Sequence, residues 1–211
     1  MRTLCIVIAS ALGATTLAGQ QSPGTVYGDG ALVWSRNDSG GQSSIVRGFV
    51  AGGETRLPIG RLIVGGGYRE GTLQPLAGTS SARDLAEGWL FLGGRPWPWL
   101  ELTTGPFIRT YTVDLSTERW VLWQVRARAE APIKELHLTS YVELWRAFAA
   151  RAEPAITAGR VQGGEAGVVW RALPGPIWLR LGYRIDDALM NGGSRSETME
   201  GIALTIGVGD R

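Results

Sequence analysis

The sequence predicts an all-β chain folded as an antiparallel up-and-down barrel of about ten strands, and three observations support this prediction. Apolar and polar residues alternate over long stretches, turn residues separate these stretches, and 31 of the 211 residues are glycine. Alternation with a period of two is typical of a strand with two unlike faces. Glycine is costly inside helices but is accommodated in turns and at strand bends.

The alternation is clearest near the end of the chain, where Ile202, Leu204 and Ile206 alternate with Ala203 and Thr205. The same pattern predicts strands at 25–36, 44–57, 61–73, 82–96, 100–114, 118–131, 136–150, 160–173, 177–189 and 197–209. Most of these exceed the length of about 5–6 residues that is usual in globular proteins. They are long enough for the roughly 9–11 residues that a tilted strand needs to cross a membrane. The fold class that we predict is therefore a transmembrane β-barrel.

The connections between the predicted strands alternate in length. Short turns are expected at 58–60, 97–99, 132–135 and 174–175, and longer polar links at 37–42, 75–81, 116–117, 153–159 and 191–196. Barrels of the outer membrane have short periplasmic turns and longer extracellular loops. Aromatic residues lie close to strand ends and predict interfacial belts, with Trp97, Trp99 and Trp170 on the short-turn side and Tyr68, Trp120 and Phe148 on the other.

The N-terminus has the pattern of a secretory signal peptide at 1–18. Arg2 supplies the positive charge, an apolar stretch runs from Leu4 to about Leu12, and Ala18 precedes the expected cleavage site. The alternative is an N-terminal membrane anchor, which the shortness of the apolar stretch disfavours. Cleavage would leave 19–211 as a single barrel domain. Because Cys5 is the sole cysteine, the mature chain would contain no disulfide, catalytic thiol or thiolate metal site.

Taken together, these features resemble the small outer-membrane β-barrel proteins of bacteria as a class. The resemblance implies a location in the outer membrane, contact with its lipids including lipopolysaccharide, and recognition by the outer-membrane assembly machinery. Its implied role is structural, adhesive or another interaction at the cell envelope. Arginines near the loop ends, among them Arg119 and Arg151, are expected to contact lipid phosphates. A net charge of +2 gives no indication of nucleic-acid binding.

The polar face of the strands is predicted to line the lumen, because so many charges would make a poor soluble core. The guessed registers place Glu87 opposite Arg109, Arg95 opposite Glu101, and Glu165 opposite Arg184. The expected ion-pair network of the lumen comprises Glu87, Arg109, Arg95, Glu101, Arg126, Glu143, Glu165 and Arg184. Arg61 and aromatic residues such as Trp145 and Trp178 share this face. Ten strands enclose little more space than the eight-stranded barrels that side chains fill, so we expect a largely filled lumen.

Three other functions remain open at this stage. An excess of inward arginine would give a narrow pore with weak anion preference. A membrane-embedded hydrolase acting on lipid or peptide would need a base such as His137, although we expect His137 to be a hydrogen-bonded lumen residue. A soluble periplasmic β-barrel that binds a small apolar ligand would need an apolar interior. Asp186, Asp187 and Glu197 are expected at a solvated rim, and no catalytic, cofactor or metal site is predicted.

Overall fold

The computed structural model describes residues 24–77, 81–113, 116–153, 157–171 and 175–209, so the predicted signal peptide lies outside the described residues. Within these ranges the strands are β1 Thr25–Ser39, β2 Gln42–Ile59, β3 Leu62–Ala77, β4 Arg83–Trp97, β5 Leu100–Val113, β6 Ser116–Ile133, β7 Leu138–Glu153, β8 Ala158–Arg171, β9 Ile177–Met190 and β10 Arg195–Val208. Two single-turn 3-10 helices, η1 Lys134–Leu136 and η2 Asn191–Gly193, lie in connections. Neither helix is long or apolar enough to cross a membrane.

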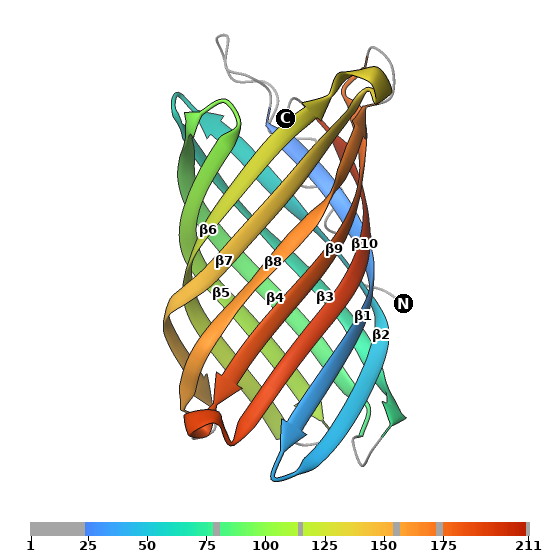
Figure 1. Cartoon of the computed structure of the whole chain (residues 1–211), viewed down its shortest axis with the longest axis vertical. Helices are drawn as coiled ribbons and strands as arrows, with labels where there is room; N and C mark the ends of the chain where they lie inside the picture. The colour runs from blue at the N-terminus through green and yellow to red at the C-terminus, as the bar shows by residue number, and fades with distance from the viewer. Residues whose placement is uncertain (1–23, 78–80, 114–115, 154–156, 172–174, 210–211) are drawn as a thin grey trace.

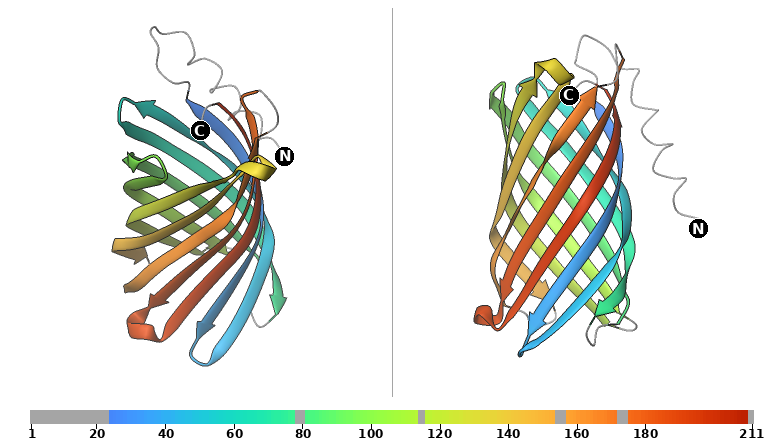
Figure 2. Two further views of the ribbon diagram at one scale, coloured as in Figure 1. Left: turned by 45° about the horizontal axis from the view of Figure 1, so that its top comes forward. Right: turned by 45° about the vertical axis from the view of Figure 1, so that its right-hand side comes forward.

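The ten strands form one closed antiparallel barrel in which each strand pairs with its neighbours in sequence (Figure 1). β1 closes the sheet by pairing with β10, from Val26 opposite Val208 to Ser39 opposite Arg195. Figure 2 shows from two further sides that the sheet curves back on itself. The predicted fold class is confirmed.

The strands are strongly staggered around the barrel. If each residue's partner on the next strand is followed from Gly30 across β2, β3, β4 and β5, the path arrives at Arg119 on β6. In the other direction, across β10, β9, β8 and β7, the path from Gly30 arrives at Ala131, which is twelve residues from Arg119 on β6. A stagger of this size requires the strands to tilt by about 35–45° from the barrel axis. The tilt accounts for strands of 14 to 18 residues, and most of them are longer than the sequence predicted.

We use the name turn end for the end of the barrel where β1 begins, β10 ends and η1 lies, which is uppermost in Figure 1. The opposite end is called the loop end. At the loop end, the prediction of a long link at 37–42 is wrong. β1 and β2 continue up to a two-residue turn formed by Gly40 and Gly41. Both glycines have positive φ, 58° and 79°, which suits a tight hairpin turn. Ser116 and Thr117, also predicted as a link, begin β6. The difference in length between the two sets of connections is therefore smaller than predicted.

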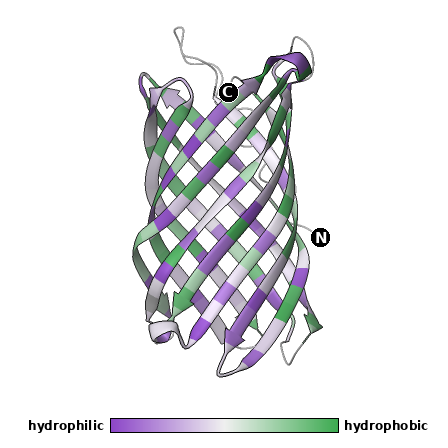
Figure 3. Ribbon diagram, in the orientation of Figure 1, coloured by the Kyte–Doolittle hydropathy of each residue, from purple (hydrophilic) through white to green (hydrophobic). Residues whose placement is uncertain are grey.

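The two faces of the sheet differ in polarity, and the apolar face is the outer one. Leu90 and Phe148 are 65% and 67% exposed on the outer wall, whereas Glu87 in the lumen is 0% exposed. Figure 3 shows hydrophobic and hydrophilic residues alternating along the strands. This arrangement is the reverse of a soluble barrel with a polar exterior.

Most of the predicted belt aromatics lie on the outer wall, and Trp120 does not. Trp97 and Trp99 are exposed at the turn end and stack with ring centroids 5.8 Å apart. Tyr68 and Phe148 are exposed on the outer wall. Trp120 is only 2% exposed, because it shares the inward face of β6 with Leu122 and donates a hydrogen bond from Nε1 to Glu118 at 2.7 Å.

Close contact between β2 and β3 leaves no room for a side chain at Gly52. A Cβ atom there would lie 2.1 Å from the backbone oxygen of Tyr68 and 2.4 Å from Cβ of Arg69. We expect Gly52→Ala to lower the free energy of unfolding by about 1–3 kcal/mol, the usual cost of overpacking. Urea unfolding of the detergent-folded protein, followed by tryptophan fluorescence, measures this loss. Gly88→Ala is the control, because its Cβ would have no neighbour closer than 3.8 Å, and equal losses in both variants would contradict the prediction.

Candidate functional site

The lumen contains the densest group of charged side chains, and its centre is the carboxylate of Glu87 on β4. Glu87 lies between its register partners Arg69 on β3 and Arg109 on β5. Arg109 Nε is 2.6 Å from one carboxylate oxygen, and Arg69 Nε donates to the other. The strand pairing therefore places two guanidinium groups beside one carboxylate, because Arg69 and Arg109 face Glu87 from the two neighbouring strands.

Arg109 also reaches across the lumen to the far wall. Its Nη2 atom lies 2.6 Å from Asp186 Oδ2 on β9, and its Nη1 atom lies 3.9 Å from Glu197 Oε1 on β10. Asp186 accepts further hydrogen bonds from Arg184 Nη2 at 2.7 Å and from Trp145 Nε1 at 3.2 Å. Side chains of β4, β5, β7, β9 and β10 thus meet at one point and bridge the barrel.

Nearly every charge in this central cluster has an opposite charge beside it. The cluster contains four arginines, Arg69, Arg83, Arg109 and Arg184, and three carboxylates, Glu87, Asp186 and Glu197. Burying a charge is costly unless a partner and hydrogen bonds compensate it. The ion pairs therefore leave the cluster with little net charge.

A second group of ion pairs lies nearer the turn end, with Arg56 at its centre. Arg56 lies 2.6 Å from both Glu54 Oε1 and Glu101 Oε1. Trp89 Nε1 donates to Glu54 at 2.7 Å. Arg95 reaches Glu101 at 3.2 Å, although the two are not register partners because the β4–β5 pairing shifts between Gly94 and Trp97. The contact predicted between Arg95 and Glu101 is therefore made across an irregularity.

The β6–β7 wall adds a third set. Arg126 Nη1 lies 3.0 Å from Glu143 Oε1, and Arg128 Nη1 lies 3.5 Å from the other oxygen of the same carboxylate. Arg128 Nε also donates to Glu130 at 2.7 Å. Arg126 and Glu143 thus lie together in the lumen, with Arg128 as an additional partner that the predicted network did not include.

Glu165 and Arg184 are register partners across β8 and β9, but each takes a different partner. Arg184 binds Asp186, which lies two residues further along the same face of β9. Glu165 accepts a hydrogen bond from the Tyr141 hydroxyl at 2.5 Å and lies 3.9 Å from Arg180 Nη1. The expected Glu165–Arg184 ion pair is thus replaced by two others, because a deeply buried carboxylate competes for Arg184.

Apolar and aromatic side chains lie in the lumen on both sides of the ion pairs. Towards the loop end the buried residues include Val46, Leu73, Leu85, Leu122, Val161 and Met190. At the turn end Tyr27 packs edge-to-face against Trp178, with ring centroids 5.4 Å apart. A cavity of about 20 Å³ beside Arg69, Arg184 and Asp186 has room for about one water molecule. Side chains thus enter the lumen from the wall both towards the loop end and at the turn end.

Several lumen residues were missed or misplaced by the sequence analysis. Asp186 and Glu197 are buried and do not form a solvated rim. Their positions follow from counting by twos from Arg184 along β9 and from Gly201 along β10, so the alternation contained this signal. Glu54 and Arg56 share the inward face of β2 with Val50. Gly52 and Gly53, between Val50 and Glu54, interrupt the alternation of polar and apolar residues there.

Two predicted lumen residues lie outside the lumen. His137 is exposed in the β6–β7 connection with a φ of 52°, because the chain turns there before β7 begins at Leu138. Arg61 is exposed in the turn between β2 and β3 for the same reason. Across the described residues, no group of three or more His, Cys, Asp or Glu side chains is placed to hold a metal ion.

Comparisons with known proteins find similarity in structure. No family model matches the sequence, and no curated protein matches it. The translocator domain of the autotransporter NalP from Neisseria meningitidis matches with a TM-score of 0.51 and 9% identity, covering 95% of this chain and 92% of that one. The β domain of the Bordetella autotransporter BrkA has a TM-score of 0.41 and 10% identity, covering 88% of this chain and 100% of its own. The similarity to NalP shows the fold, which is that of an outer-membrane β-barrel.

The contact between Glu87 and Arg109 predicts strongly non-additive mutations. We expect Glu87→Gln and Arg109→Gln each to destabilise the barrel by about 3–5 kcal/mol, because each leaves a buried charge with too few partners. The double variant is expected to lose less than the sum, with an interaction energy of about 0.5–3 kcal/mol. Urea unfolding of all four proteins in one detergent measures the cycle.

Arg95→Gln serves as the control for this cycle. The Arg95 side chain is 37% exposed, so its removal is expected to cost about 1 kcal/mol or less. Additive losses for Glu87 and Arg109 would show that the two groups do not interact directly.

Proposed function

We propose that this protein is a bacterial outer-membrane barrel with a closed lumen that has a structural, adhesive or other interaction role at the cell envelope. The observation that carries the proposal is the inverted polarity of the barrel. Large apolar side chains such as Leu90, Leu144 and Leu204 are exposed on the wall, while charged residues are buried inside. Water would penalise such an exterior, whereas hydrocarbon favours it.

The backbone supports the same proposal. A lipid bilayer offers no hydrogen-bonding partners to an open sheet edge, and the pairing of β1 with β10 removes that edge. The exposed tryptophans Trp97 and Trp99 at the turn end suit the interface between hydrocarbon and headgroups. Export through the predicted signal peptide at 1–18 and handling by the outer-membrane assembly machinery belong to this proposal.

The filled lumen argues against the narrow pore. Side chains from opposite walls meet at Asp186, and the central arginines are paired with carboxylates, which weakens the basis for an anion preference. A soluble barrel for an apolar ligand requires an apolar interior, and this interior holds Glu87, Arg109 and Asp186.

The hydrolase alternative loses its proposed base. His137 is exposed in a turn at the turn end, while Asp186 and Glu197 are held in ion pairs inside the lumen. A general base must reach the proton that it removes, and these groups do not converge on an accessible site. The geometry therefore favours a barrel that acts through its outer surfaces.

Membrane fractionation tests the location. We expect the protein in the outer-membrane fraction, with different mobilities on SDS gels before and after boiling, because a closed barrel resists SDS until it is heated. A soluble periplasmic protein with no shift would overturn the proposal.

A charge on the wall sharpens this test. Leu204 is exposed on the outer face of β10, and Leu204→Arg is expected to cost about 2–4 kcal/mol in a bilayer. Ser43→Arg, at an exposed position near the loop end, is the matched control and should cost little. If the two variants were equally stable in lipid vesicles, the wall around Leu204 would not face hydrocarbon.

Planar-bilayer recordings test whether the lumen conducts. We expect no stable conductance from the folded protein, since the central cluster and the apolar layer near the loop end obstruct the lumen. Reproducible conductance with a weak preference for anions would instead support the narrow pore.

A further inference from the structure

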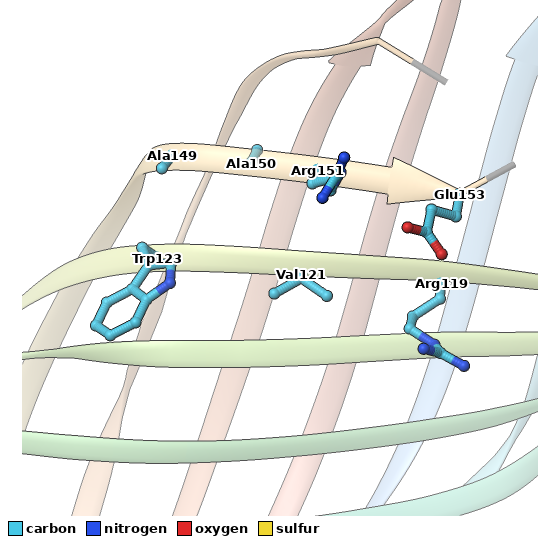
Figure 4. A pocket seen from close by; sticks show the side chains of 7 residues that line it. All are labelled: Arg119, Val121, Trp123, Ala149, Ala150, Arg151 and Glu153. Carbon is cyan, nitrogen blue, oxygen red and sulfur yellow. The ribbon is translucent and has the colours of Figure 1, made fainter. Parts of the chain in front are cut away.

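A groove of about 370 Å³ lies on the outer wall between β6 and β7, towards the loop end. Figure 4 shows Arg119, Val121 and Trp123 on one strand and Ala149, Ala150, Arg151 and Glu153 on its neighbour. Trp123 and Ala149 mark one end of the groove, and Arg119 and Glu153 mark the other (Figure 4). The groove is separate from the lumen network described above.

An irregularity in strand pairing creates this hollow. Trp123 pairs with Ala149, but the next residue, Gln124, pairs with Ala147, so Phe148 is an extra residue in β7. Such a β-bulge bends the strand locally and re-aims its side chains. Ala149 follows the bulge on the outer face, and its small side chain leaves space beside the indole of Trp123.

The groove is lined by two arginines available for an external partner. Arg119 and Arg151 are both exposed, and among the described residues neither guanidinium lies within 4.0 Å of a carboxylate oxygen. Arg36 and Arg160, which are also near the loop end, are paired with Asp38 and Asp187. Glu153 is the register partner of Arg119, so the groove carries two positive charges and one negative charge.

The surroundings of the groove select the type of ligand. Val121 and Trp123 line it with apolar surface, and the neighbouring Phe148 is 67% exposed. The groove therefore joins an apolar wall to a pair of cations at the end of that wall. A molecule that matches both parts has a hydrocarbon chain and an anionic headgroup, since guanidinium groups bind phosphate oxygens in a forked geometry.

We propose that this groove binds one anionic phospholipid-type molecule of the surrounding leaflet, with its phosphate on Arg119 and Arg151 and its acyl chain beside Trp123 and Ala149. The inference rests on the proposed function, because it requires a wall that faces lipid. The bulge at Phe148 supplies the space, and Arg119 and Arg151 supply the charge. The lipid is thus held at a defined place on the wall.

Native mass spectrometry of the full-length barrel in detergent micelles tests this site with phosphatidylglycerol as the probe. We expect the protein to retain one phosphatidylglycerol molecule in preference to zwitterionic phosphatidylcholine at equal concentration. The double variant Arg119→Gln/Arg151→Gln should bind phosphatidylglycerol about thirtyfold more weakly, because each of the two arginines near a lipid headgroup contributes on the order of 1 kcal/mol.

Two further variants distinguish a built site from general attraction. Arg36→Gln/Arg47→Gln removes the same formal charge at the β1–β2 side of the loop end and should leave retention unchanged. Ala149→Phe fills the groove without changing charge and should also weaken retention. Equal losses in the two arginine double variants, or no selective retention by the unmodified protein, would overturn the proposal.

The two proposals can fail separately. Each variant is first checked for the gel shift on boiling, which confirms that its barrel is folded. A folded barrel that shows no lipid selectivity would overturn the groove site and leave the outer-membrane location intact. A protein that fractionates as soluble would overturn the location, whatever its behaviour in micelles.

Discussion

The hydrogen-bonded closure of β1 against β10 is the constraint on which the rest of the structure depends. The two strands pair continuously from Val26 to Ser39, so the sheet has no free edge. An unpaired edge would expose backbone donors and acceptors, which hydrocarbon cannot satisfy. Closure with ten strands and a stagger of twelve residues also sets the circumference and the tilt, and these decide how much space the lumen contains.

The lumen has to be filled within that circumference by side chains from ten inward faces. Bulky residues such as Trp120 and Phe107 occupy much of it, and Arg109 is long enough to reach the opposite wall. Because the space is closed to bulk water at its centre, each guanidinium needs a carboxylate within reach. Glu87 binds Arg69 and Arg109 for this reason, and Asp186 binds Arg109 and Arg184. The packing and the charge balance of the lumen are consequences of one geometric limit.

The outer wall follows from the same alternation, but its features depend on departures from regular pairing. A regular wall of Leu, Ile and Val offers lipid chains a uniform surface. The bulge at Phe148 interrupts it and brings Arg119, Arg151 and Trp123 around a hollow. In the proposed role the barrel acts through its ends and its wall, and such an irregularity is the place where the wall departs from a uniform apolar surface.

The sequence by itself determined that the chain forms about ten long strands with two unlike faces, because a period of two is a local property that each stretch carries independently. It also indicated the pairing of Glu87 with Arg109, from a turn centred on Pro98. The observed turn pairs Trp97 with Leu100, and the shift in pairing between Gly94 and Trp97 restores the register in which Glu87 lies opposite Arg109. Only the tertiary structure decided that Arg109 meets Asp186, that Arg184 prefers Asp186 to Glu165, and that Phe148 is bulged. These contacts join strands that are distant in sequence, or depend on a shift in pairing. The curvature of the closed sheet brings such residues together, and no local pattern encodes that curvature.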